Sequence, residues 1–391
     1  MPDNIVTTFD LTSVDDTGEH AIMEVLRIDR ENILAFDLDK DRRLLRVETA
    51  TAGTAAHINA FIAHVSARRQ FMARKVIRRN DVAKPTFHDI DSAIASSPDM
   101  DVLGNGLTAL SGKLLALFRF FERQFLAFSR QFDAKENHYP VIVPRKILED
   151  LRYFENFPSQ VTFCSHLRGS LPQLESIAYT ARKNPEALSE NYELNLADPD
   201  YVLTPAVCLP CYRQQSGVVI PHGTVSALTM QNHVFRYEGG NFRPLTRAWD
   251  FTVRDIVFFG SAKDLERLRN EVMDCTVELC RKLDLQVTIE VANDPFFLNA
   301  SRDKVVYQRM GEVKYELLFE LPYRQEFLAA SSFNLHREFY TSIYNTRLEN
   351  GKTAESACMG FGIERYVYGF LSQKGMDPAN WPAFVTSELN G

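Results

Sequence analysis

The chain has 391 residues, more than one typical domain needs, and its 45% hydrophobic and 24% charged residues are those of a globular protein with a sizeable core. A net charge of −7 argues against a protein that binds nucleic acid with its whole surface, although a local basic patch is compatible with it. No apolar stretch is long enough to span a membrane, and residues 1–20 lack the basic start and apolar core of a signal peptide, so we expect a cytoplasmic protein.

Residues 1–96 are expected to form a small N-terminal α+β domain of unknown role. Short apolar runs precede a helical pattern from about residue 54 to residue 77. The Ser-Ser-Pro sequence at residues 96–98 is typical of a joint between domains, so we expect a second domain over residues 97–391.

A basic run lies at the end of this helical pattern. Such a run docks phosphate backbones or acidic protein helices in some proteins and forms a solvated helix face in others, and both interpretations stay open. Its members are Arg68, Arg69, Arg74, Lys75, Arg78 and Arg79.

The second domain opens with an expected helix at about residues 107–132, where leucines and phenylalanines recur three and four residues apart along one face. After residue 137 come short β-rich runs, with one clear helix at residues 263–282. Strands joined by turns, with few helices between them, predict an α+β fold with a mostly antiparallel sheet flanked by helices rather than a doubly wound parallel sheet. The expected strands are residues 139–143, 201–203, 234–237, 251–259 and 287–291.

Two local patterns carry chemistry, and the first is a Phe-Arg-Tyr-Glu sequence at residues 235–238, followed by a glycine-containing loop and a second strand. The alternation on both sides predicts a hairpin that brings Arg236, Glu238 and Phe251 close together. An arginine fork binds phosphate, a carboxylate accepts from the adenine amino group, and an aromatic ring stacks on a base. A charged hairpin with an internal Arg–Glu pair accounts for the pattern equally well.

The second pattern is Gly-Phe-Gly-Ile-Glu-Arg at residues 360–365, leading into an apolar helix. Small residues let the backbone approach a ligand, and a helix that begins near Ile363 can hold Arg365 over a polyphosphate. A turn with a surface arginine is the alternative interpretation.

Together the two patterns resemble motifs 2 and 3 of class II aminoacyl-tRNA synthetases, and the helix at 107–132 with residues 139–144 loosely resembles motif 1. The resemblance implies a homodimer that binds ATP, with the motif 2 arginine on the α-phosphate and the motif 3 arginine on the γ-phosphate. The two catalytic residues would be Arg236 and Arg365. By position, the ATP-binding residues would be Arg236, Glu238, Arg247, Phe251, Asn334 and Arg365.

Within this superfamily the chain looks like the amino acid:[carrier protein] ligases, homologues of the zinc-dependent (atypical) seryl-tRNA synthetases that lack a tRNA-binding domain. This resemblance implies a ligase that activates a small amino acid, such as glycine, alanine or serine, as an aminoacyl-adenylate. It also implies transfer of the aminoacyl group to the phosphopantetheine thiol of a carrier protein. The resemblance covers residues 103–384 and is carried by residues 154–163, 203–212, 290–297, 314–318, 332–334 and 357–365.

Members of that group hold zinc with Cys, Glu and Cys, and the matching positions here are Cys208, Asp255 and Cys358. Two thiolates and a carboxylate are sound zinc ligands, and three protein ligands leave an open position for a substrate amine. Asp255 is one methylene shorter than the glutamate, which requires a closer backbone or weakens the site. Two alternatives stay open: a pair of buried apolar cysteines, and a Cys-x-x-Cys site that includes Cys211.

Magnesium is the second metal that the resemblance implies. Class II synthetases usually bind it through a glutamate just before the Ser-x-Asn strand, and this chain has an apolar residue at the expected position. Glu326, slightly displaced, is the candidate ligand, and Glu316 and Glu320 are alternatives. A solvated surface carboxylate is the other interpretation of each of them.

Two other functions remain open. A zinc-type seryl-tRNA synthetase would need a tRNA-binding appendage, and the N-terminal domain has neither a long helical hairpin nor a strongly basic character outside one helix, so we do not expect tRNA as a partner. A non-catalytic, synthetase-like paralogue is favoured by Asp255 and by the missing magnesium glutamate. The two phosphate-binding arginines and Glu238 argue against it.

Overall fold

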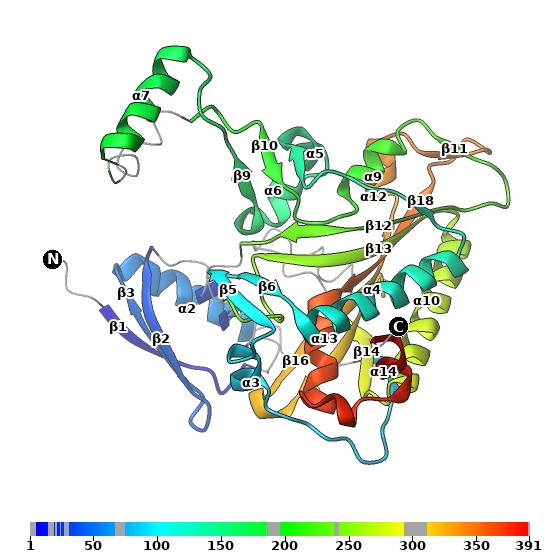
Figure 1. Cartoon of the computed structure of the whole chain (residues 1–391), viewed down its shortest axis with the longest axis horizontal. Coiled ribbons are helices and arrows are strands. Elements are labelled where there is room, and N and C mark those ends of the chain that lie inside the picture. Colours follow the sequence, from blue (N-terminus) through cyan, green and yellow to red (C-terminus); the bar gives the residue numbers. More distant parts are fainter. Residues whose placement is uncertain are drawn as a thin grey trace.

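A computed structural model describes residues 5–14, 31–66, 75–184, 196–237, 242–292 and 311–389, together with positions 19, 22, 23, 25, 26 and 186. Within these residues the largest sheet has eight strands in the order β4-β14-β15-β16-β18-β13-β12-β7 (Figure 1). All its neighbouring strands are antiparallel except β7 and β12, so the predicted α+β fold with a mostly antiparallel sheet is confirmed. The strands are β4 (Val76–Asn80), β14 (Val287–Val291), β15 (Lys314–Leu321), β16 (Glu326–Arg337), β18 (Glu355–Gly362), β13 (Asp250–Gly260), β12 (Ser226–Phe235) and β7 (Lys135–Glu136).

Three long helices cover one face of this sheet: α4 (Gly112–Gln131), α10 (Ala262–Lys282) and α13 (Ile363–Lys374) (Figure 1). Their apolar stripes pack on the strands, as where the ring of Phe125 stacks on that of Phe361 in β18 with 4.4 Å between centroids. Burial of apolar side chains between these helices and the sheet stabilises this side of the fold. It leaves the other face for smaller elements and for the site.

The other face is partly covered by short elements that pack on β12, β13 and β18 in a second apolar cluster. Here α5 (Arg145–Asp150), α6 (Tyr153–Asn156) and α9 (Leu209–Gln214) lie beside a small sheet of β8 (Ile142–Pro144), β10 (Tyr201–Leu203) and β9 (Thr162–Cys164). From β9 the chain continues into α7 (Leu171–Lys183), which projects away from the body (Figure 1). The remaining elements are β5 (Met100–Gly104), β6 (Leu107–Leu110), β11 (Val219–Ile220), β17 (Arg347–Leu348), α12 (Phe339–Ile343) and α14 (Ala383–Leu389), with short 3-10 helices at Pro158–Gln160, Pro322–Arg324 and Pro378–Asn380.

The N-terminal region contains a separate three-stranded sheet of β1 (Ile5–Asp10), β3 (Leu44–Thr49) and β2 (Ile33–Asp39), with α2 (Ala52–Ser66) and a small apolar core of its own. The strand β4 follows it and pairs with β14 in the main sheet, and α3 (Asp91–Ala95) comes next. The domain boundary at residue 96 stays a prediction.

Two helix predictions were too long. The helix expected to reach residue 77 ends at Ser66 where the structure describes it, and Arg78 and Arg79 lie in β4 because pairing with β14 decides their conformation. Of the other basic residues, Lys75 precedes β4 and Arg68, Arg69 and Arg74 lie outside the described residues. Likewise residues 107–110 form β6, so α4 begins at Gly112. In the described part of the chain, no helix combines the length and the apolar character needed to cross a membrane.

Candidate functional site

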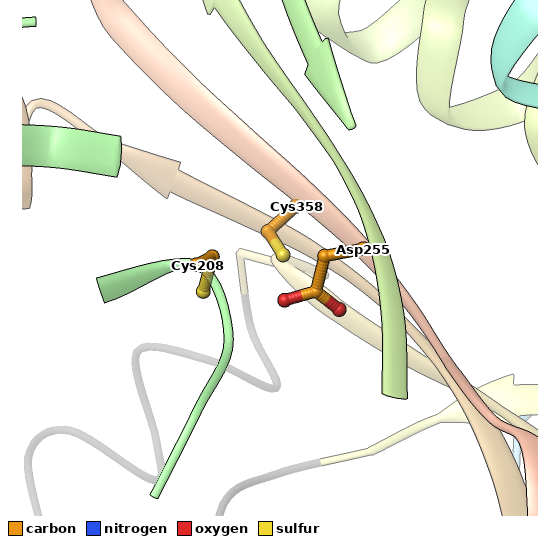
Figure 2. Close-up of side chains that lie close together, drawn as sticks. All are labelled: Cys208, Asp255 and Cys358. Carbon is orange, nitrogen blue, oxygen red and sulfur yellow. The ribbon is translucent and has the colours of Figure 1, made fainter. Parts of the chain in front are cut away.

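Cys208, Asp255 and Cys358 meet on the face of the sheet opposite the three long helices (Figure 2). Antiparallel pairing places Asp255 in β13 opposite Gly360 in β18, two residues from Cys358, and Cys208 immediately precedes α9. The three side chains each offer a donor atom, and these atoms lie within 4.8 Å of one another. All three residues are at most 7% exposed. The structure therefore brings together the three residues that the sequence predicted as a set.

Burial and mutual contact shift the pKa of each of these groups. Burial raises the pKa of the Asp255 carboxyl to about 6, although hydrogen bonds from the two thiols oppose the rise. The hydrogen bond to Cys208, then burial and the nearby Asp255, raise the pKa of Cys358. The hydrogen bond from Cys358 lowers the pKa of Cys208, but burial and Asp255 outweigh it and the net pKa is raised. These groups share protons that a bound cation would displace.

The donor set fits zinc with a small adjustment. Ligand atoms around a tetrahedral zinc lie about 3.5–3.8 Å apart, given zinc–sulfur distances of about 2.3 Å and zinc–oxygen distances of about 2.0–2.2 Å. The three donors here lie within 4.8 Å of one another, so no pair must approach by more than about 1.3 Å to reach these distances. Cys211 is buried nearby but lies outside this set.

Gly360 makes room for a polar group beside the triad. A Cβ at this position would lie 2.8 Å from Asp255 Oδ1 and 3.2 Å from Ser332 Oγ, so the two side chains approach each other across the glycine. Asn334 lies opposite Cys358 and donates from Nδ2 to Ser332 Oγ at 3.2 Å. The strand that carries Ser332 and Asn334 thus lies beside the three donor residues.

The predicted hairpin is present, and it holds Arg236 above Phe251. The strands β12 and β13 pair antiparallel, and Arg236 comes directly after β12. Its Nε donates to the carbonyl oxygen of Pro205 at 2.8 Å, and its guanidinium carbon lies 5.5 Å from the centre of the Phe251 ring. Glu238, the predicted adenine reader, lies outside the described residues.

Arg365 approaches the hairpin loop from the start of α13. Its Nε donates to the carbonyl oxygen of Thr246 at 3.0 Å and its Nη1 to that of Ala329 at 2.8 Å. Arg247 follows Thr246, and its backbone N–H donates to the carbonyl oxygen of Arg243 at 2.9 Å, which closes the loop. Arg365 is therefore bonded to the residue directly before Arg247, and both arginines lie at the hairpin loop.

The magnesium candidates differ in their surroundings. Glu326 begins β16 and accepts from Arg243 Nη1 at 2.8 Å, so it lies at the hairpin loop. Glu316 lies opposite Ser332, on the face that carries the donor triad, and pairs with Lys314 at 3.1 Å. Glu320 lies opposite Phe327. The assignment of magnesium to Glu326 stays a prediction.

Sequence reasoning missed Glu364 as a structural member of the site. Both of its carboxylate oxygens accept from the backbone N–H of Thr252, at 2.9 and 3.0 Å. The carboxylate thus extends the sheet beyond the end of β18 and ties α13 to the hairpin. The signal was its place directly before Arg365 in the Gly-x-Gly-x-Glu-Arg pattern.

The sheet, with the β12–β13 hairpin and with α13 after β18, has the fold of solved class II aminoacyl-tRNA synthetases. The chain is similar over 99% of its length to the M. kandleri seryl-tRNA synthetase in complex with A. aeolicus tRNASec, with a TM-score of 0.73, 20% identity and 77% of that chain covered. It is also similar to the cytoplasmic serine–tRNA ligase of Naegleria fowleri in complex with AMP, with a TM-score of 0.61, 10% identity and coverages of 87% and 70%.

Sequence comparison points to the same group of enzymes. The chain is 27% identical over 292 residues to the type-2 serine–tRNA ligase of Methanothermobacter thermautotrophicus, which covers 74% of this chain and 57% of that protein. It is 26% identical over 292 residues to the type-2 serine–tRNA ligase of Methanocaldococcus jannaschii, with coverages of 73% and 56%. The chain thus spans a little over half the length of these relatives. No protein-family model matches the chain.

These findings correct two predictions. The specification as a carrier-protein ligase is wrong, because the relatives are serine–tRNA ligases. The expectation that tRNA is not a partner is wrong as well, since the similar M. kandleri enzyme was solved with a tRNA. The likeness to that enzyme covers 99% of this chain and therefore includes most of the N-terminal region.

Proposed function

We propose that this protein activates serine with ATP and transfers it to tRNA, as a serine–tRNA ligase of the type-2 kind. The observation that carries the proposal is the buried triad of Cys208, Asp255 and Cys358. Two of its members lie on β13 and β18, the strands that also lead to the Arg236 hairpin and to Arg365. A metal-type donor set that can bind an amine, together with two candidate phosphate ligands, can bring an amino acid and a nucleotide into one site.

In the first step the serine carboxylate attacks the α-phosphorus of ATP, and the bond to the bridging oxygen breaks to release pyrophosphate. Arg236 would hold the α-phosphate and Arg365 the γ-phosphate, so that positive charge meets the negative charge that spreads over the phosphates. Phe251 and Glu238 would bind the adenine. Magnesium would neutralise phosphate charge, with Glu326 as its predicted protein ligand.

The triad would bind the amino acid. Cys208, Asp255 and Cys358 would hold zinc, which would supply a Lewis acid that binds the substrate α-amine. Ser332 and Asn334 lie beside the three donor residues and would offer a hydroxyl and an amide group to the substrate. The names of the relatives support serine over glycine and alanine.

In the second step a hydroxyl of the terminal ribose of tRNA attacks the carbonyl carbon of the adenylate, and AMP leaves. The tRNA acceptor is supported by the names of the relatives and by the complex of the M. kandleri enzyme. Since the chain spans 57% of the length of the first of these relatives, binding of tRNA by this chain alone is part of the proposal.

Two assays test the proposal in order. Amino-acid-dependent exchange of pyrophosphate into ATP, measured with serine, glycine and alanine, should be fastest with serine. Transfer of labelled serine to total tRNA should then give acid-precipitable, base-labile product. Absence of exchange with every amino acid would identify a non-catalytic protein, and exchange without charging of tRNA would overturn the proposed acceptor.

A further inference from the structure

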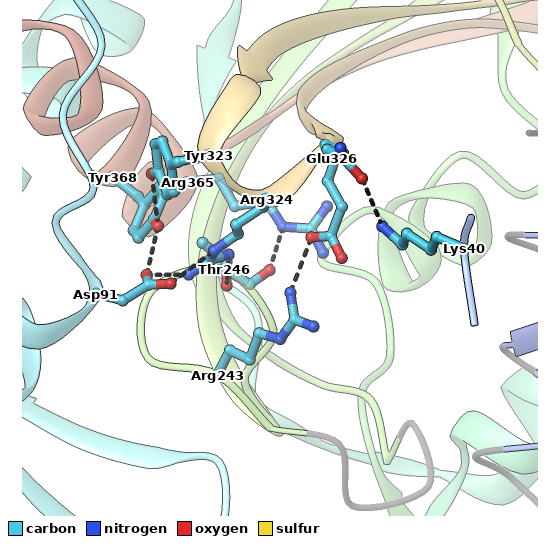
Figure 3. A network of polar contacts seen from close by, with 10 residues as sticks. Lys40, Asp91, Arg243, Thr246, Tyr323, Arg324, Glu326, Arg365 and Tyr368 are labelled. Atoms are coloured by element: carbon cyan, nitrogen blue, oxygen red, sulfur yellow. Dashed lines mark hydrogen bonds and ion pairs between the residues drawn. The ribbon is translucent and has the colours of Figure 1, made fainter. Parts of the chain in front are cut away.

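Asp91, Arg324, Tyr368 and Tyr323 form a polar clasp that joins α3, the 3-10 helix before β16, and α13 (Figure 3). Arg324 Nε donates to Asp91 Oδ2 at 2.9 Å, and Nη2 donates to the other carboxylate oxygen. A paired arginine–carboxylate contact of this kind fixes both groups in orientation as well as in position.

The arginine of the clasp is shielded, whereas the Asp91 side chain is 45% exposed, and the hydrogen bonds of the clasp are consistent with one another. The Arg324 side chain is 11% exposed, and its guanidinium carbon lies 4.7 Å from the centre of the Tyr368 ring. The Tyr368 hydroxyl donates its one hydrogen to Asp91 Oδ1 at 2.6 Å, so the Tyr323 hydroxyl donates to Tyr368 at 2.8 Å. Burial acts to raise the pKa of Asp91, but hydrogen bonds from Arg324 and Tyr368 hold it below its usual value.

Arg324 also contacts the loop that carries the candidate ATP-binding Arg247. Its Nη1 donates to Thr246 Oγ1 at 3.5 Å, whereas Arg365 donates to the carbonyl oxygen of the same residue at 3.0 Å. Thr246 is therefore held from two sides, by the clasp and by the candidate γ-phosphate ligand. A cavity of about 310 Å³ separates α3 from this loop, with Ile94 on one wall and Phe242 and Pro244 on the other.

The position of Asp91 is set by α13, the helix that begins near Arg365. The Thr86 hydroxyl donates to the carbonyl oxygen of Gln373 at 2.8 Å, and the His88 N–H donates to that of Ser372 at 2.7 Å. These contacts strap residues 86–91 along the helix as far as Tyr368. Residues 86–91 thus reach the loop at Thr246 through the Asp91 carboxylate and Arg324.

We propose that Asp91 is a positioning residue for ATP, which acts through Arg324 on Thr246 and so on the loop and Arg365. This inference rests on the proposed function. Without the carboxylate, the shielded guanidinium of Arg324 loses its ionic partner and must turn to another acceptor. Thr246 then loses its side-chain contact with Arg324 and keeps the bond from Arg365 and its own backbone bonds within the loop. The loop no longer presents its arginines to the polyphosphate in one arrangement.

The test compares Asp91→Asn, Asp91→Glu and Arg324→Lys with wild type in serine-dependent pyrophosphate exchange and in equilibrium binding of Mg-ATP. Asp91→Asn should raise the KM and the Kd for ATP about tenfold, and should change the KM for serine by less than about twofold. Asp91→Glu, which keeps the charge, should restore most of the ATP affinity. The matched control is Asp284→Asn, which removes an ion pair of 2.7 Å to Lys374 on the same helix.

Thermal unfolding of each variant separates positioning from folding. A lower Tm for Asp91→Asn with an unchanged KM and Kd for ATP would overturn the proposal, and so would equal rises in the KM of ATP and of serine. If Asp91→Asn does not fold, Tyr368→Phe, which removes one hydrogen bond to Asp91, decides by the same two quantities. Wild-type protein that binds ATP but exchanges no pyrophosphate would overturn the proposed function, and the two Kd values would still decide the role of Asp91.

Discussion

The amino-acid half and the nucleotide half of the candidate site are held by different kinds of contact. Strand pairing fixes Asp255 and Cys358, which are 4% exposed. Arg236 and Arg365 are only half-buried and are held by side-chain hydrogen bonds to neutral carbonyl groups. An anion attracts a guanidinium more strongly than a neutral carbonyl does, so a polyphosphate can draw these arginines to itself. The three donor groups are therefore preformed, whereas the two arginines proposed to bind the nucleotide can rearrange on binding.

The largest expected effect is at the nucleotide half. Arg236→Ala and Arg365→Ala should each lower kcat/KM for pyrophosphate exchange by about 10²–10³-fold, because each removes a charge that stabilises the transition state. The free energy of unfolding should change less than the exchange activity, since both side chains are only half-buried, although Arg236 also interacts electrostatically with Asp255. Exchange kinetics and denaturant unfolding measure the two quantities.

The matched control for the arginine variants is Arg267→Ala, which removes an exposed arginine paired with Glu271 on α10. It should leave exchange unchanged. An Arg236→Ala or Arg365→Ala protein that exchanges pyrophosphate at the wild-type rate would show that the assignment of the motifs is wrong.

A smaller effect is expected at the metal half. Wild-type protein should carry about one zinc per chain, and Cys358→Ser should lower the zinc content and raise the KM for serine by about tenfold or more. The KM for ATP should change far less, because the metal would contact the amine and not the nucleotide. Elemental analysis of the purified proteins and exchange kinetics provide the measurements.

Cys211→Ser is the control for this metal prediction, because Cys211 is buried three residues beyond Cys208 but lies outside the donor set. It should keep the metal, and loss of zinc in this variant would favour the Cys-x-x-Cys alternative. Asp255→Glu would introduce the longer carboxylate that the zinc-containing group named in the sequence analysis has at this position. Full activity in metal-free wild-type protein would remove zinc from the proposed mechanism.

The sheet was predictable where the sequence pattern and the final pairing agree. The predicted strand 251–259 is β13, and the predicted helix 263–282 is α10, because both have clear periodicity and polar ends. Residues 107–110 were misread because Leu107 and Leu110 have helical spacing. The structure pairs them with β5 in a hairpin that turns at Gly106, whose φ is 71°.

The candidate site was predictable only where motifs mark it. Cys208, Asp255 and Cys358 came from a resemblance, and strand register then brought them together. No such signal marks the contact of Arg324 with Asp91, which lie 233 positions apart and meet because two separate segments pack on α13. Long-range ion pairs of this kind depend on the finished fold, and a single sequence does not encode them in any local pattern.

The smallest expected effect concerns Glu364, which links the two halves of the site through Thr252. Burial raises the pKa of its carboxyl from the ordinary 4.5 to about 7, against hydrogen bonds from its own N–H and from Thr252. Its folded pKa lies above the unfolded value, so its proton contributes stability that is present below about pH 4.5 and is lost as the pH rises through about 7. Glu364→Gln does not titrate and retains an oxygen for the Thr252 N–H. The variant should therefore gain about 1–3 kcal/mol in unfolding free energy relative to wild type across this window, measured by denaturant unfolding at several pH values. Parallel pH profiles for the two proteins would show that the Glu364 carboxyl titrates normally.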